Sequence, residues 1–211
     1  MKFPLIAYFN LLSNIFPIGA GLYKWRYLKK EYLLFFIYVV VSGISELTTY
    51  ITARYGIKNI FVFPVYSLIE YCLLVFIFEK WLKWKGFKTI IRGSIILYVI
   101  FCGLSLIMFD TFTASIQIIR SVSSVIFIFL AAVALLDLMK GKIVNILKES
   151  RFWIITGIMI YFAGNSILFI FSGIIPHIRI EDAMTMWTVH WSSNVFVNIC
   201  YMTAFLCLRS E

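Results

Sequence analysis

Seven long runs of apolar residues, separated by short polar and charged stretches, dominate the chain. They cover residues 4–23, 32–53, 59–79, 90–109, 112–136, 152–175 and 184–208. A hydrocarbon core of about 30 Å needs about 20 helical residues, and the runs have that length. A transmembrane β-barrel would show strict alternation over segments of about ten residues, and residues 125–136 show none. The pattern predicts an all-α, polytopic integral membrane protein with seven transmembrane helices in a single domain, residues 1–211.

The basic residues between these runs predict the orientation of the chain. With the N-terminus outside, most Lys and Arg side chains fall on cytoplasmic segments, as the positive-inside rule requires. The cytoplasmic set is Lys24, Arg26, Lys29, Lys30, Lys80, Lys83, Lys85, Lys88, Arg92, Lys140, Lys142, Lys148, Arg151 and Arg209, and the outer set is Lys2, Arg54, Lys58 and Arg179. We therefore expect an outer N-terminus, a cytoplasmic C-terminus and a location in the plasma membrane, specifically a bacterial inner membrane.

Composition supports lipid as the solvent and explains the net charge. Hydrophobic residues make up 62% of the chain and charged residues 14%, whereas about a quarter of a soluble domain is charged. The net charge of +9 is then a topology signal and an attraction to anionic inner-leaflet lipid, and we expect no nucleic-acid binding. The four cysteines lack paired spacing and are expected to pack as small apolar residues. The sequence indicates no metal and no other cofactor.

Polar side chains inside the predicted helices fall on single faces and at one depth. At about 1.5 Å per residue, they lie about 9 to 15 Å below the outer end of each run. Because a charge at the bilayer centre costs about 2.5 to 3.5 kcal/mol, the ionisable members are expected to face inward. We predict a polar cavity in the outer half that binds a small ligand or responds to protons. Its candidate residues are Glu46, Glu70, Arg120, His190, Asn194, Asn165, Asn10 and Tyr66.

Charge balance predicts how these groups pair. Arg120 is expected to form an ion pair with Glu46 or Glu70, leaving the other glutamate protonated or bonded to His190 or an asparagine. A second interpretation stays open, in which the polar layer only joins helices through hydrogen bonds worth about 0.6 kcal/mol each. For Asn10 taken singly, this second interpretation is the favoured one.

Two other features concern the shape of the bundle. Pro17 and Pro64 lie inside predicted helices and are expected to kink them. The fourth run, residues 90–109, carries almost no polar side chains, so we expect it to face lipid or a partner.

The sequence disfavours an enzyme without excluding one. The motifs H-E-x-x-H and G-x-S-x-G are absent, and His177, one of only two histidines, is predicted to lie in a loop. Glu46 and Glu70 could still form a carboxylate pair for acid–base chemistry. A retinal protein is excluded because no predicted span interior contains the lysine that a Schiff base requires. A small transporter with three helices on either side of a fourth is a stronger alternative, although the two halves show no sequence repeat.

Four short motifs resemble those of uncharacterised bacterial seven-helix membrane proteins. They are S-x-x-S-E-L at residues 42–47, L-I-E at 68–70, F-W-I from Phe152, and H-x-x-x-N-x-x-x-N from His190 to Asn198. Some such proteins are similar to the membrane sensor regions of histidine kinases, so the resemblance implies a non-enzymatic, sensor-like or receptor-like module. Because no kinase or other output domain is found within the 211 residues, a partner is expected to contact the basic cytoplasmic loops. A small transporter or channel is the alternative, followed by an accessory or structural membrane subunit.

Overall fold

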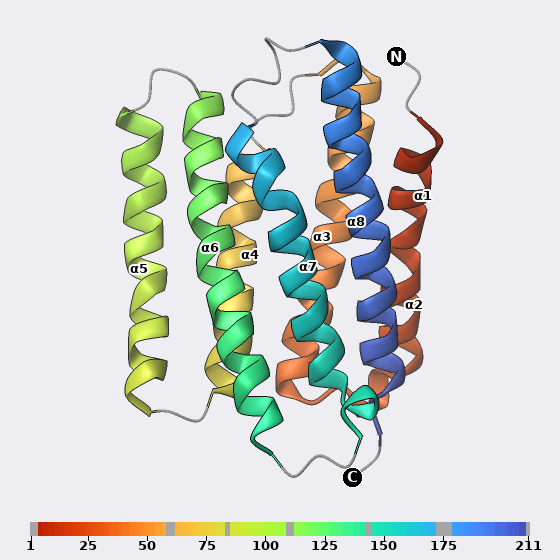
Figure 1. Cartoon of the computed structure of the whole chain (residues 1–211), viewed down its shortest axis with the longest axis vertical. Coiled ribbons are helices and arrows are strands. Elements are labelled where there is room, and N and C mark those ends of the chain that lie inside the picture. The colour runs from red at the N-terminus through yellow and green to blue at the C-terminus, as the bar shows by residue number, and fades with distance from the viewer. Residues whose placement is uncertain are drawn as a thin grey trace.

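The computed structural model describes residues 4–57, 62–82, 85–108, 112–141, 145–171 and 179–209, and all regular structure in these residues is helical (Figure 1). The α-helices are α1 (Leu5–Ser13), α2 (Ile15–Tyr23), α3 (Lys30–Arg54), α4 (Val62–Trp81), α5 (Lys85–Met108), α6 (Phe112–Met139), α7 (Ser150–Phe171) and α8 (Ile180–Leu206). The predicted all-α class is confirmed. Parts of three predicted runs, at residues 59–61, 109 and 172–175, lie outside the described residues, as does His177.

Six segments are long and apolar enough to cross a membrane, which makes the chain a multi-pass membrane protein. They are Leu5–Tyr23, Lys30–Arg54, Val62–Trp81, Gly86–Ser105, Ser115–Met139 and Ser150–Ile170. The last helix, α8, is not among them, because polar side chains along its length lower its hydropathy. Its 27 residues are nevertheless more than the roughly 20 that a crossing requires.

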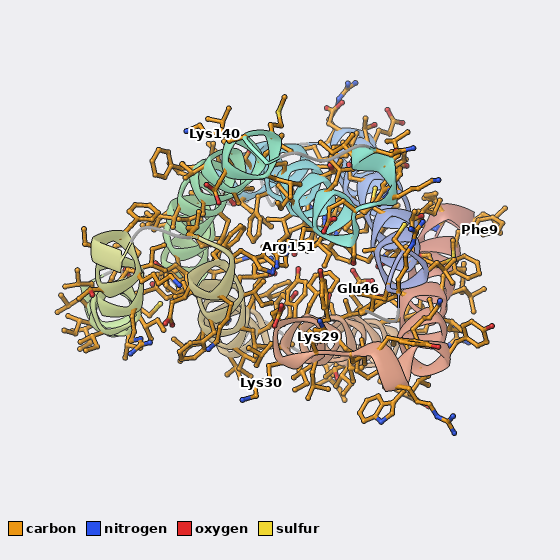
Figure 2. The ribbon with its side chains drawn as sticks, turned by 90° about the horizontal axis from the view of Figure 1, so that it is seen from below. Phe9, Lys29, Lys30, Glu46, Lys140 and Arg151 are labelled. Atoms are coloured by element: carbon orange, nitrogen blue, oxygen red, sulfur yellow. The ribbon has the colours of Figure 1, made fainter. Side chains whose placement is uncertain are left out.

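The helices form a closed ring with α5 outside it, as the end-on view shows (Figure 2). Around the ring, α3 packs against α4, α4 against α6, α6 against α7, and α7 against α8, while α1 and α2 pack against both α8 and α3. The outlying α5 packs against α4 and α6. Only 11% of its apolar stretch is buried, against 53% for α7. The fourth run is therefore the peripheral helix, in agreement with its lack of polar residues.

Aromatic side chains fill the ring on the side nearer the end of α8. Phe35 on α3 contacts Tyr201 and Phe205 on α8, with ring centroids 4.9 and 5.5 Å apart, and Phe127 on α6 lies 4.9 Å from Phe162 on α7. Because lipid is as apolar as these rings, close van der Waals packing rather than exclusion from water is what holds the helices together here.

Helical hydrogen bonding in the first span is interrupted at Asn14, between α1 and α2, although Asn14 itself keeps helical dihedral angles, with φ −62° and ψ −24°. Pro17 has no N–H to donate to the carbonyl of Ser13, and the side chains of Ser13 and Asn14 donate to the Asn10 carbonyl at 2.7 and 3.1 Å. The missing N–H of Pro17 therefore accompanies a gap in hydrogen bonding, and the kink predicted at Pro17 stays a prediction. Pro64 lies in the first described turn of α4, next to residues 58–61 outside the described part of the chain, so the kink predicted there stays a prediction.

Candidate functional site

Glu70 on α4 and Arg120 on α6 form an ion pair inside the ring. Arg120 Nη1 lies 2.6 Å from Glu70 Oε2, and the two side chains are only 5% and 1% exposed. A buried charge costs several kcal/mol unless it is paired and hydrogen-bonded, so this geometry requires both partners. The expectation that Arg120 pairs with one of the two glutamates is confirmed, and the partner is Glu70.

Neighbouring side chains complete what we call the ion-pair cluster, which consists of Tyr66, Ser67, Glu70, Arg120 and Tyr161. The Tyr66 hydroxyl donates to Glu70 Oε1 at 2.9 Å. Arg120 Nη1 also donates to Ser67 Oγ at 3.0 Å, and Nη2 donates to the Tyr161 hydroxyl at 2.9 Å. Three helices, α4, α6 and α7, are joined by these bonds, which fixes the guanidinium in one orientation.

Glu46 on α3 is held by amides rather than by a cation. Asn10 Nδ2 on α1 donates to Glu46 Oε2 at 2.5 Å, and Asn194 Nδ2 on α8 donates to Oε1 at 2.8 Å. Figure 2 shows Glu46 in the interior of the ring, and no ion pair joins it to Lys or Arg within the described part of the chain. The predicted bonding of the second glutamate to an asparagine is therefore confirmed.

His190 extends this group into what we call the amide cluster, made of Asn10, Glu46, Asn165, His190 and Asn194. His190 Nδ1 lies 2.5 Å from Asn165 Oδ1, and His190 Nε2 lies 3.3 Å from Asn194 Nδ2. An amide oxygen only accepts and an amide nitrogen only donates, so Nδ1 carries the hydrogen and Nε2 is the acceptor. The contacts therefore fit a neutral imidazole. Asn165 Nδ2 closes the cluster by donating to Asn194 Oδ1 at 3.5 Å.

A cavity of about 20 Å³ lies between the two clusters. Its lining residues are Asn14, Tyr38, Ser42, Glu46, Tyr161, Asn194, Val197, Asn198 and Tyr201. Glu46 and Asn194 belong to the amide cluster and Tyr161 to the ion-pair cluster, so the cavity connects the two. A volume of this size holds about one water molecule. The cavity expected in the outer half is thus too small for an organic ligand in this conformation.

A larger cavity lies at the other end of the bundle. It has a volume of about 300 Å³, and its lining includes Trp81 on α4, Asp137 on α6, Glu149 just before α7 and Arg151 in the first turn of α7. This volume is at the lower end of the range for small-molecule sites. Sequence patterns did not indicate it, because its charged residues fall at helix ends, where charge is ordinary.

The described residues contain no group of three or more His, Cys, Asp or Glu side chains placed to hold a metal ion. No family model, curated protein or solved structure matches this chain. The resemblance to the sensor regions of histidine kinases accordingly stays a prediction. The two clusters and the cavity between them are the basis for a functional proposal.

The structure brings all eight predicted site residues into the two bonded clusters. Five lie in the amide cluster and three in the ion-pair cluster. Sequence reasoning missed Tyr38 and Tyr201, which also line the cavity. A helical repeat could have found both, since Tyr38 lies two turns before Glu46 and Tyr201 lies two turns after Asn194.

Proposed function

We propose that this chain is a non-enzymatic, sensor-like membrane module whose amide cluster responds to protons in the outer half of the bundle. The observation that supports this most directly is the position of Asn194. Its amide nitrogen donates to Glu46 at 2.8 Å and faces His190 Nε2 at 3.3 Å. One side chain on α8 therefore contacts two titratable groups, one of which lies on α3.

Protonation of either group disrupts this arrangement. A proton on His190 Nε2 places an N–H against the amide hydrogens of Asn194, and a proton on Glu46 removes the negative charge that two amides stabilise. In both cases the contact between α3 and α8 weakens. The other ionisable groups that line the same cavity as Glu46 are Tyr38 on α3, Tyr161 on α7 and Tyr201 on α8, and Tyr161 bonds Arg120 of the Glu70–Arg120 pair.

Cavity size supports a proton over an organic ligand. The space beside Glu46 is about 20 Å³, whereas small-molecule pockets have volumes of about 300 to 1,000 Å³. A proton, a water molecule or a small ion is the largest species that fits without rearrangement of the helices.

The same proposal includes seven spans in a bacterial inner membrane, with an outer N-terminus and α8 as the seventh span. The start of α1 and the end of α8 lie at opposite ends of the bundle (Figure 1), as an odd number of crossings requires. Lys29, Lys30 and Lys140 lie at the end seen in Figure 2. We assign this end to the cytoplasm, where the basic loops contact a partner that carries the response onward.

Tryptophan fluorescence tests the proton response. The ring of Trp187 lies 5.5 Å from that of His190, and an imidazolium quenches a nearby indole. In protein purified into lipid nanodiscs and titrated from about pH 8 to about pH 4, emission is expected to fall on acidification. The change should be small in Trp187→Phe and in His190→Gln. An unchanged emission in the unmodified protein, or an equal fall in His190→Gln, contradicts the proposal.

A small transporter or channel is the second candidate, favoured by the interrupted hydrogen bonding of the first span at Asn14, which also lines the cavity, since interrupted helices form the ion sites of many transporters. Proton flux into liposomes that contain the purified protein separates the two. Flux driven by a pH gradient and lost in Glu46→Gln supports transport. A pH response of Trp187 without flux supports a sensor, and neither flux nor a pH response supports an accessory subunit.

A further inference from the structure

We infer that the larger cavity, at the Arg151 end of the bundle, binds a small zwitterion, a molecule that carries both an ammonium group and an acidic group. The cavity has a volume of about 300 Å³ and lies between the ends of α4 and α6 and the start of α7. Figure 2 shows Arg151 inside the ring. The cavity shares no lining residue with the amide cluster, so the inference goes beyond the proposed function and does not depend on the proton response.

Side chains of opposite charge line this cavity without pairing. Asp137 on α6 and Arg151 on α7 both line it, but no ion pair joins Asp137 to any Lys or Arg within the described part of the chain. Arg151 Nη2 lies 3.9 Å from Glu31 Oε1, which is longer than a hydrogen bond. A molecule with a charge of each sign can therefore bind both side chains at once.

These two charges lie at helix ends that disfavour them. Asp137 is in the last turn of α6, which ends at Met139, and Arg151 is in the first turn of α7, which begins at Ser150. Backbone carbonyls make the end of a helix partly negative, and backbone N–H groups make its start partly positive. Glu149, just before α7, has the favourable sign. Helix stability thus accounts for Glu149, whereas Asp137 and Arg151 require another explanation, which a ligand supplies.

Buried donors in the cavity wall call for an acidic group. Trp81 lines the cavity and is only 5% exposed, and its indole N–H has no hydrogen-bond acceptor among the described residues. The same holds for Nε of Arg151. Both groups can only donate, and a buried donor without an acceptor is costly. An acidic group of the ligand beside Arg151 provides an acceptor, and its ammonium group then pairs with Asp137.

The size and charge of the cavity exclude simpler ligands. Small-molecule sites have volumes of about 300 to 1,000 Å³, so this one suits a short molecule. The formal charges of Asp137, Glu149 and Arg151 sum to −1, which disfavours a plain anion, while Arg151 disfavours a cation that has no acidic group. Leu138 and Ile155 add apolar surface to the lining, which fits a carbon chain between the two charged groups.

Isothermal titration calorimetry of the purified protein in phosphatidylcholine nanodiscs tests the site. The probes are ω-amino acids of increasing length, from glycine to 6-aminohexanoate, at a pH of about 7, where they carry both charges. We expect saturable binding of at least one of them. The amine and the carboxylic acid of the same chain length, each lacking one charged group, should bind at least tenfold less tightly. No saturable binding in the series, or equal binding of the amine, overturns the inference.

Variants of the lining residues assign the two ends of the ligand. Asp137→Asn is expected to weaken binding of the amino acid at least tenfold. In Arg151→Gln, the preference for the amino acid over its matched amine should fall below threefold, while Arg151→Lys should keep most of it. This change in preference does not arise from misfolding, which weakens both probes equally. A preference that persists in Arg151→Gln overturns the inference.

Two exposed residues provide matched controls. Asp182→Asn removes a carboxylate in the first turn of α8, and Lys140→Gln removes a positive charge just after α6. Neither residue lines the cavity, so both variants should bind the amino acid within twofold of the unmodified protein. A loss in these controls as large as in Asp137→Asn would show an effect of overall charge and contradict the site.

The outcomes separate this inference from the proposed function. A pH response of Trp187 without saturable binding of any ω-amino acid overturns the inference and leaves the proton response standing. Saturable binding that is lost in Asp137→Asn supports the site. If Trp187 emission is then insensitive to pH, the proton-responsive function is the part that fails.

Discussion

Among single residues, Arg120 makes the contact whose loss is expected to cost most. It is buried, and its guanidinium bonds Glu70, Ser67 and Tyr161 on two other helices. Arg120→Leu leaves the Glu70 charge without its partner, so we expect a loss of about 3 to 5 kcal/mol of stability and a lower folded yield. The midpoint of unfolding in a denaturing detergent titration measures this loss.

An exposed ion pair serves as a control that separates the loss of the buried ion pair from the loss of a charge in general. Arg179 and Asp182 form an ion pair in which the side chains are 77% and 53% exposed, and Arg179→Leu is expected to cost no more than about 1 kcal/mol. In Glu70→Leu/Arg120→Leu no buried charge remains, so this double variant should regain much of the stability lost in Arg120→Leu. Equal losses in Arg120→Leu and Arg179→Leu contradict the importance of the buried pair.

The cost of a charge in lipid made the site residues predictable from the sequence. That cost requires Glu46, Glu70 and Arg120 to face inward, and the structure has all three inside the ring. The choice of Glu70 over Glu46 as the partner of Arg120 was not predictable. Helical periodicity gives the face on which a side chain lies, but it does not give which helix lies opposite that face.

At the scale of elements, the interrupted hydrogen bonding between α1 and α2 is the feature most open to mutation. Pro17→Ala restores an N–H that can bond the Ser13 carbonyl, and proline in a helix interior costs about 3 kcal/mol relative to alanine. We expect Pro17→Ala to raise the thermal midpoint of unfolding. An unchanged or lowered midpoint would show that the missing N–H at residue 17 does not destabilise the first span.

The contact between α7 and α8 depends on Gly157. A Cβ added there would lie 2.4 Å from Cε1 of Tyr201, whereas a Cβ at Gly103 on α5 would meet nothing within 4 Å. Gly157→Ala is therefore expected to destabilise the protein by about 1 to 3 kcal/mol. Gly103→Ala should be neutral or stabilising by up to about 1 kcal/mol. Thermal unfolding of both variants measures the difference, and equal midpoints contradict this packing.

The existence and class of the helices followed from the apolar runs, but their exact ends did not. A run of apolar residues shows where a chain can be buried in lipid, and helices extend beyond it into polar sequence, as α3 does by beginning at Lys30.

For the whole molecule, the distribution of Lys and Arg between the loops predicts the orientation of the chain in the membrane. Tyr55 follows α3 and Gly141 follows α6 at the opposite end, and both are exposed. In a background without native cysteines, Tyr55→Cys should react with an impermeant maleimide added to intact cells. Gly141→Cys should react only after the membrane is opened. The reverse pattern contradicts an outer N-terminus.

Neither the order of the helices around the ring nor the small volume of the cavity inside it could be predicted from the sequence. Each polar stripe was visible along the chain, but the contacts of α8 with α1 and α2, far away in the sequence, depend on the packing of all the helices. Of the eight predicted residues only Glu46 and Asn194 line the cavity, and its volume of about 20 Å³ is smaller than a small-molecule ligand requires. Amides of one helix bond the carboxylate of another and occupy the space.

In the function proposed above, protons that enter the amide cluster separate α3 from α8. Spin labels at Ile51 on α3 and Val189 on α8, both exposed, allow the distance between the two helices to be measured by pulsed electron paramagnetic resonance. On acidification we expect this distance to increase in the unmodified protein. In Asn194→Ala, which lacks the connecting amide, it should hardly change with pH. A distance that does not vary with pH in the unmodified protein, or one that varies equally in Asn194→Ala, would contradict the account.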